Sequence, residues 1–209
     1  MNLRAKLYWT VGIAVFIALA AWRYRQDSCG PFPDWQTSPY VLPYPVGANY
    51  FVSQANGSTG GHRGDYKYAY DFVMPIGTTV TAARAGVVAE IRMKFRNGQS
   101  GEGESNWVKI RHADGTIAAY SHLTESGALV RIGDSVVAGQ PVGLSGNTGN
   151  TGGLPHLHFH LCACSESVDC GTMPVTFRNA DWNPGGLTAK RNYVAHPYAR
   201  QDVNLSPSG

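Results

Sequence analysis

Three histidines stand at alternate positions in residues 156–160, directly after a glycine-rich loop at 146–153. Successive side chains of an extended strand point to opposite faces, so His156, His158 and His160 would share one face, opposite the apolar residues between them. Neutral imidazole is a common zinc ligand and also transfers protons near neutral pH. The pattern therefore predicts a metal site in which one histidine binds the ion while a neighbour stays available for proton transfer.

Two further segments carry polar groups that could join the histidine strand. His62 lies in a glycine-rich loop, and Asp71 follows among tyrosine and phenylalanine side chains. A carboxylate in such apolar company is costly unless it pairs with a cation or a metal ion, so either an arginine or a metal is expected beside it. His122 closes another apolar run. A catalytic zinc site typically has three protein ligands and one open position, which this set could supply.

Short strands separated by Gly, Asn and Asp would hold these residues in place. Alternating patterns predict strands near residues 50–54, 67–73, 79–82, 87–95, 106–112, 116–121, 135–137 and 157–162. Asp114-Gly115 predicts a hairpin turn between two of them. No long helical periodicity follows residue 26, so we predict an all-β fold of mainly antiparallel sheets with long loops.

Length and composition indicate one folded domain. The chain has 209 residues, of which 43% are apolar and 25 are glycine, which fits a loop-rich β protein. The net charge of +3 comes from four cations near the start, because residues 27–209 carry 13 basic against 14 acidic side chains. Nucleic-acid binding normally needs a basic patch, so we predict no nucleic-acid partner.

The first 26 residues carry an apolar stretch between cationic flanks, typical of a segment that directs export. Ala18-Leu19-Ala20 has the form of a signal-peptide cleavage site, whereas the cations just after it favour an uncleaved membrane anchor. We favour the anchor, with the chain facing the periplasm or the extracellular side. The predicted organisation is therefore an anchor or signal segment at 1–26, a Pro-rich linker at 27–45, the main domain at 46–200 and a flexible tail at 201–209.

Export would place the cysteines in an oxidising compartment, which favours disulfides. The candidates allow three connectivities, or alternatively a soft-metal site near the histidines. They are Cys29, Cys162, Cys164 and Cys170.

Four segments recur in a characteristic order. They are a His and an Asp before Pro75-x-Gly77-Thr78-x-Val80-x-Ala82-x-x-x-Gly86-x-Val88, then Tyr120-x-His122-Leu123, then Gly143-x-Ser145-Gly146-Asn147-Thr148-Gly149, and last Pro155-His156-Leu157-His158-Phe159. In these segments the chain resembles the lysostaphin-type zinc endopeptidases, which cut peptide cross-links in bacterial cell walls. The resemblance covers most of residues 46–177 and implies the lysostaphin-type peptidase fold, here preceded by one N-terminal hydrophobic helix.

By position, the resemblance implies that His62, Asp71 and His158 hold one Zn²⁺ ion and that His122 and His156 form the catalytic pair. It implies hydrolysis of peptide stems or cross-bridges of peptidoglycan. The chain has no HExxH glutamate, so the two histidines are the groups available for proton transfer.

Substrate contacts are expected along the Gly/Asn/Thr loop, where glycine lets a peptide backbone approach closely. The candidates are Tyr120, Asn147 and Gly149.

Two positions depart from the common family pattern. Eight residues separate His62 from Asp71, where the family usually has three, and Asp65 is too close to His62 to replace Asp71. His160 stands where the family often has an acidic residue, so either it orients a neighbouring side chain or it has no role.

Two other functions would also use these residues. One is an inactive domain of this fold that binds cell wall or activates another hydrolase, but such a domain does not need a complete set of ligands and proton-transfer groups. Another is metal storage, which would predict several labile ions instead of one tightly held ion. The sequence leaves open whether a separate protein activates this one.

Overall fold

The computed structural model describes residues 31–101, 103–162 and 171–199. All secondary structure in these ranges belongs to the unit that begins at Phe32. It consists of strands and two short 3₁₀ turns, η1 (Trp35–Thr37) and η2 (Gly64–Tyr66), with no α-helix in the described ranges. The predicted all-β class is therefore confirmed, while the predicted N-terminal hydrophobic helix falls outside the described residues.

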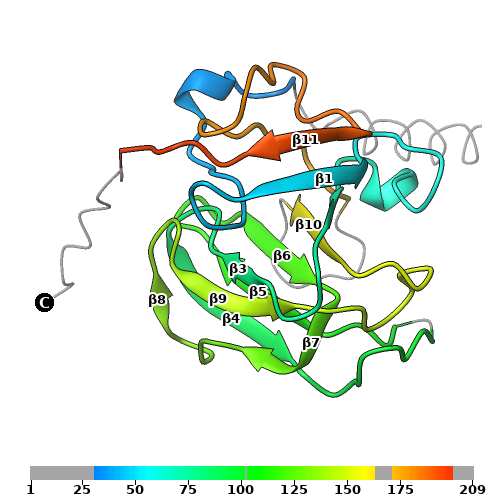
Figure 1. Ribbon diagram of the computed structural model, residues 1–209. Coiled ribbons are helices and arrows are strands. Elements are labelled where there is room, and N and C mark those ends of the chain that lie inside the picture. Colours follow the sequence, from blue (N-terminus) through cyan, green and yellow to red (C-terminus); the bar gives the residue numbers. More distant parts are fainter. Residues whose placement is uncertain (1–30, 102, 163–170, 200–209) are drawn as a thin grey trace, which may run out of the picture. The chain divides into compact units, whose positions relative to one another are not determined.

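The strands form two antiparallel sheets (Figure 1). The large sheet has the order β11-β1-β2-β10-β6-β5-β4-β8. Its strands are β1 (Asn49–Gln54), β2 (Tyr70–Val73), β4 (Gly86–Arg92), β5 (Trp107–Arg111), β6 (Ile117–Ser121), β8 (Ser135–Val136), β10 (His156–Cys162) and β11 (Arg191–Val194). The small sheet has the order β3-β9-β7, with β3 (Thr79–Thr81), β9 (Pro141–Ser145) and β7 (Leu123–Ala128).

Each predicted strand has a counterpart in the structure, and the predicted hairpin is β5–β6, with Trp107 opposite Ser121. Three strands, β7, β9 and β11, were not predicted. β7 reads LTESGA and β9 reads PVGLS, so Gly, Ser and Pro hide the alternation that identifies a strand. β11 reads RNYV and buries only Tyr193, so it shows no apolar alternation.

The histidine strand β10 lies inside the large sheet between β2 and β6. Figure 1 shows β10 beside β6. His158 is paired with Asp71 on β2 and with Ser121 on β6. The residues between the histidines, Leu157 and Phe159, are fully buried, as the alternation predicts. One face of β10 therefore belongs to the core and the other carries the histidines.

Both sheets contribute to one core. Val80, Leu123 and Val142 of the small sheet belong to the same buried cluster as Phe72 and Phe159 of the large sheet. Edge-to-face aromatic pairs reinforce this cluster, since such pairs add about 0.5–1.5 kcal/mol beyond the area they bury. The sheet face opposite the histidines is thus rigidly packed.

Part of the predicted Pro-rich linker is also buried in this core. Tyr40, Leu42 and Tyr44 are at most 5% exposed, and the Leu42 N–H donates to Asn179 Oδ1 at 2.7 Å. Residues 40–44 therefore pack as part of the domain, while the domain boundaries themselves stay predictions. Among the described residues no helix has the length and apolarity needed to cross a membrane, and the predicted anchor at 1–26 falls outside them.

Candidate metal centre

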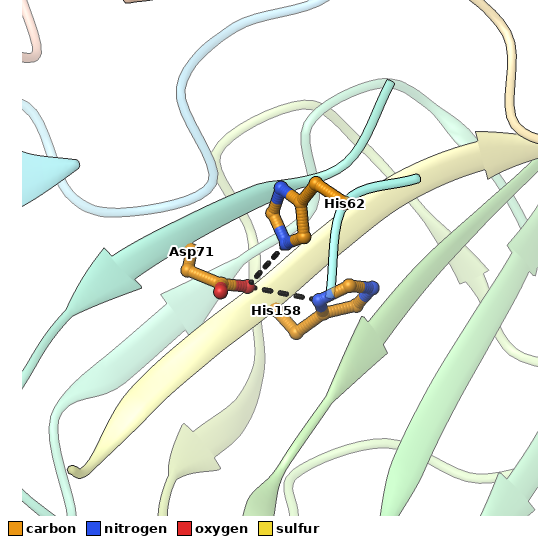
Figure 2. Close-up of side chains that lie close together, drawn as sticks. All are labelled: His62, Asp71 and His158. Atoms are coloured by element: carbon orange, nitrogen blue, oxygen red, sulfur yellow. Dashed lines mark hydrogen bonds and ion pairs between the residues drawn. The ribbon is translucent and has the colours of Figure 1, made fainter. Parts of the chain in front are cut away.

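Three side chains from separate parts of the chain meet on the histidine face of the large sheet (Figure 2). Asp71 Oδ1 lies 2.8 Å from His158 Nδ1 and 3.1 Å from His62 Nε2. One potential ligand atom from each residue lies within 4.8 Å of the other two. The pairing of β2 with β10 sets Asp71 beside His158, and the loop before η2 brings His62 back to them.

The surroundings of His62 fit a metal ligand. Its side chain is buried, and neither ring nitrogen makes a well-aligned hydrogen bond, although Nε2 lies within ion-pair distance of Asp71. A buried polar atom without a hydrogen bond is costly, by about 1–3 kcal/mol. A metal ion held between the His62 nitrogen, Asp71 Oδ1 and His158 Nδ1 would satisfy these atoms, and this donor set suits zinc.

Asp71 is held as a carboxylate. Burial acts to raise its pKa, but the neighbouring His158 and His62 outweigh burial and lower the pKa below its ordinary value. Its second oxygen, Oδ2, accepts a hydrogen bond from Gln54 Nε2 at 2.9 Å. Gln54 thus fixes the carboxylate and leaves Oδ1 to face the histidines.

His122 and His156 stand beside the cluster as a second histidine pair. Their ring centroids are 4.7 Å apart, and His156 Nε2 lies 3.6 Å from Asp71 Oδ1. His122 Nδ1 lies 2.6 Å from the Thr148 carbonyl oxygen, and His156 Nδ1 lies 2.8 Å from that of Leu154. Because a carbonyl oxygen only accepts, Nδ1 carries the proton in both rings and Nε2 keeps its lone pair.

Both histidines of this pair are kept neutral. Burial, followed by the neighbouring His158 and His156, lowers the pKa of His122 to about 3. Burial is also the main reason that the pKa of His156 is lowered. Neutral rings with a free Nε2 can accept a proton.

Two loops hold His122 in an unusual backbone conformation. Its φ is 62°, in the left-handed region that non-glycine residues rarely adopt, and such strain is often found at functional sites. Ser105 Oγ accepts the His122 N–H at 3.1 Å and lies 3.3 Å from Nδ1. Thr148 is fully buried and hydrogen-bonded through its own hydroxyl. Neither Ser105 nor Gln54 was predicted, since nothing in the local sequence indicates these contacts.

The eight residues between His62 and Asp71 include η2, which carries Tyr66. The Tyr66 ring lies edge-on to His158 and His160, with centroids 5.6 Å from each. Asp65 is exposed and is not part of the metal cluster. The longer loop therefore still places His62 beside Asp71, and it also packs the Tyr66 ring against His158 and His160.

His160 also contacts the cluster. Its Nδ1 lies 3.1 Å from His158 Nε2, and burial is the main reason that its pKa is well below the ordinary value. His160 therefore lies behind a prospective metal ligand as a neutral ring.

The three substrate-binding candidates lie in two places, the core and the glycine-rich loop. Tyr120 is fully buried, and its hydroxyl accepts the Ala83 N–H at 2.8 Å. It is paired with Phe159 and is buried with it in the core, so the structure gives no support to the predicted substrate contact. Asn147 and Gly149 lie in the glycine-rich loop, but Gly149 packs against Ser105 so closely that a Cβ there would lie 2.9 Å from Ser105 Cβ. Contact of Asn147 and Gly149 with substrate stays a prediction.

The cysteine predictions lie mostly outside the described residues. Cys29, Cys164 and Cys170 fall in ranges that the structure does not describe. Within the described ranges, the metal cluster consists of two histidines and one aspartate and contains no cysteine. A disulfide among these residues stays a prediction.

Comparison with known proteins agrees with this architecture. The model of a family described as "Peptidase family M23" matches residues 65–170, and the chain belongs to that family. The match includes Asp71, His122, His156 and His158, whereas His62 precedes it. The predicted resemblance to lysostaphin-type peptidases is confirmed.

Individual relatives cover part of the chain. The chain is 35% identical over 138 residues to the peptidoglycan DD-endopeptidase ShyA of Vibrio cholerae, covering 65% of this chain and 30% of the relative. It is 32% identical over 152 residues to the glycyl-glycine endopeptidase ALE-1 of Staphylococcus capitis, covering 72% and 36%. The chain thus spans about a third of the length of these relatives.

Among solved structures, the catalytic domain of the antimicrobial peptidase lysostaphin from Staphylococcus simulans is 33% identical. It aligns with a TM-score of 0.42 over 65% of this chain and 84% of that domain. The family assignment itself rests on the sequence match.

Proposed function

We propose that this protein is a zinc-dependent endopeptidase that hydrolyses peptide stems or cross-bridges of bacterial peptidoglycan. The observation that carries the proposal is the convergence of His62, Asp71 and His158 beside two neutral histidines, in a member of peptidase family M23. The names of the relatives support peptidoglycan as the substrate, since one is a peptidoglycan endopeptidase and another a glycyl-glycine endopeptidase.

His62, Asp71 and His158 would hold one zinc ion through two nitrogens and one oxygen. When bound, zinc supplies a Lewis acid that polarises a carbonyl group and makes water more acidic. Asp71 contributes a negative charge to the site, and Gln54 keeps its ligand oxygen aimed at the histidines. The buried setting strengthens these electrostatic interactions.

His122 and His156 carry the proton transfers. Their Nδ1–H groups are tied to the carbonyls of Thr148 and Leu154, so each ring presents Nε2 to the site in a fixed tautomer. At Nε2 such a ring accepts a proton from the attacking water and then delivers it to the leaving amine. While protonated, it also stabilises negative charge on the carbonyl oxygen under attack.

We further propose that the enzyme works outside the cytoplasm, held at the membrane by residues 1–26. The support is the apolar stretch between cationic flanks in the sequence, together with a substrate that lies outside the cytoplasm. Fractionation of cells that express the full chain, followed by protease treatment from outside, would test this placement. Recovery of the chain in the cytoplasmic fraction would contradict it.

The enzymatic proposal is tested by digestion of purified peptidoglycan with the full chain and mass spectrometry of the released fragments. One substrate should have direct stem-to-stem cross-links and another glycine bridges, which separates the two classes of bond. New amino termini within peptides are expected, and His122→Ala should release them far more slowly. His196→Ala is the matched control, since His196 pairs with Asp181 on the surface, away from the cluster. The proposal would be overturned if neither substrate yielded peptide-bond cleavage while zinc was bound.

A further inference from the structure

Both ring nitrogens of His158 have a partner. Nδ1 faces Asp71 at 2.8 Å, and Nε2 lies 3.1 Å from Nδ1 of His160, two residues further along β10. The two rings are inclined by 71°, with centroids 5.2 Å apart. Alternate residues of a strand share a face, but this contact also requires both rings to turn toward each other.

A metal ligand must present a lone pair, which decides where the protons sit. If His158 binds the ion through Nδ1, its only proton is on Nε2, and that N–H can donate to an acceptor at 3.1 Å. Nδ1 of His160 must then be unprotonated, so His160 carries its own proton on Nε2. From this geometry we infer that His160 is a positioning residue that fixes the tautomer and orientation of His158. The inference rests on the proposed zinc site.

The neighbouring side chains hold His160 in this arrangement. Tyr66 packs edge-on against both rings at equal centroid distances of 5.6 Å and so limits their rotation. Across the sheet His160 is paired with Ala119, whose small side chain leaves room for the imidazole. His160 is only partly exposed, which limits the access of solvent that would compete for the His158 proton.

A neutral acceptor has a different consequence from a carboxylate. A carboxylate behind a ligating histidine pulls its proton and makes the ligating nitrogen more basic, whereas a neutral imidazole orients the ring with little added charge. In this chain a neutral imidazole, that of His160, therefore takes the hydrogen-bond position behind the metal ligand His158. His160→Asp should accordingly bind Zn²⁺ more tightly than His160→Asn.

Two substitutions separate hydrogen bonding from packing. His160→Phe keeps a ring against Tyr66 and removes the acceptor, while His160→Asn places an amide oxygen near the position of Nδ1. Zn²⁺ affinity of the full chain, measured by competition with a chromogenic chelator, should fall about 10- to 100-fold in His160→Phe. It should largely recover in His160→Asn. His196→Asn, at an exposed histidine paired with Asp181, should leave affinity unchanged.

Direct observation of the protons completes the test and needs no variant. Long-range ¹H–¹⁵N NMR of the zinc-loaded wild type should show the Nε2–H tautomer for both His158 and His160. Melting temperatures in excess chelator would identify a variant that fails to fold. In that case the wild-type spectrum alone tests whether His160 accepts the His158 proton.

The outcomes separate this inference from the proposed function. Tight zinc binding by the wild type with equal affinity in His160→Phe, or an Nδ1–H tautomer at His160, would overturn the positioning role alone. A wild type that does not bind Zn²⁺ would overturn the zinc enzyme and this inference together.

Discussion

Thr148→Val removes a hydroxyl that connects the glycine-rich loop to Asn106 and to Leu123, the residue after His122. Thr148 Oγ1 accepts the Asn106 N–H at 2.9 Å and donates to the Leu123 carbonyl at 2.9 Å, and its side chain is fully buried. Valine has nearly the same shape, so the loss is one of hydrogen bonding. A buried group left without its partner costs about 1–3 kcal/mol. The Leu123 carbonyl keeps a longer contact of 3.4 Å with Asn106 Nδ2, so most of the cost falls on the Asn106 N–H.

We expect the free energy of unfolding to fall by about 1–3 kcal/mol in Thr148→Val, because one buried group, the Asn106 N–H, loses its partner. Urea unfolding in excess chelator measures this quantity without a contribution from bound metal. The turnover rate should also fall while zinc affinity stays unchanged, because the Thr148 carbonyl orients His122 and contacts none of the proposed ligands.

Thr151→Val is the matched control in the same loop. Thr151 is only partly buried and accepts a single hydrogen bond, from the Gly153 N–H at 3.3 Å. Its substitution should change stability by about 0.5 kcal/mol or less. If Thr148→Val were as stable and as active as Thr151→Val, the assigned role of the buried hydroxyl would be refuted.

Three further predictions concern single histidines. His62→Ala should lose zinc to a chelator and with it all hydrolysis, so a variant with stoichiometric metal by mass spectrometry and full activity would contradict the ligand assignment. His122→Ala should keep zinc but lower the turnover rate about 10²- to 10⁴-fold, the usual contribution of acid–base catalysis, and an undiminished rate would remove it from the mechanism. Burial lowers the pKa of His112 from 6.5 to about 4. Below pH 6.5 the unfolded chain therefore takes up a proton at this residue that the folded chain does not bind, and the free energy of unfolding falls by up to about 3 kcal/mol by pH 4. His112→Asn, which can still donate to the Ala85 carbonyl, should remove this part of the acid sensitivity in urea titrations between pH 7 and 4, and an identical pH dependence would refute the cause.

Local patterns were enough to predict β10 and its two faces. Alternation placed three histidines on one side and Leu157 and Phe159 in the core, and both features hold in the structure. Tyr120, predicted as a substrate contact, is paired with Phe159 and is buried with it in the core. A residue that belongs to a recurring motif need not belong to the site.

Contacts between distant loops could not be predicted in this way. Ser105 reaches His122 across 17 positions and Gln54 reaches Asp71 across 17, with no local pattern to mark either contact. Such contacts depend on how loops pack over the sheet, which propensity and periodicity do not determine.

The sequence by itself determined the chemistry available to this protein, because residue types fix which atoms can bind a metal or carry a proton. It also determined the strand on which three histidines alternate. The tertiary structure alone decided that His62 reaches Asp71 across a long loop, since only the pairing of β2 with β10 and the path of that loop set the distance. It likewise decided which nitrogen of each histidine is free, because each tautomer follows from the direction in which the folded chain turns the ring, toward the Thr148 carbonyl for His122 and the Leu154 carbonyl for His156.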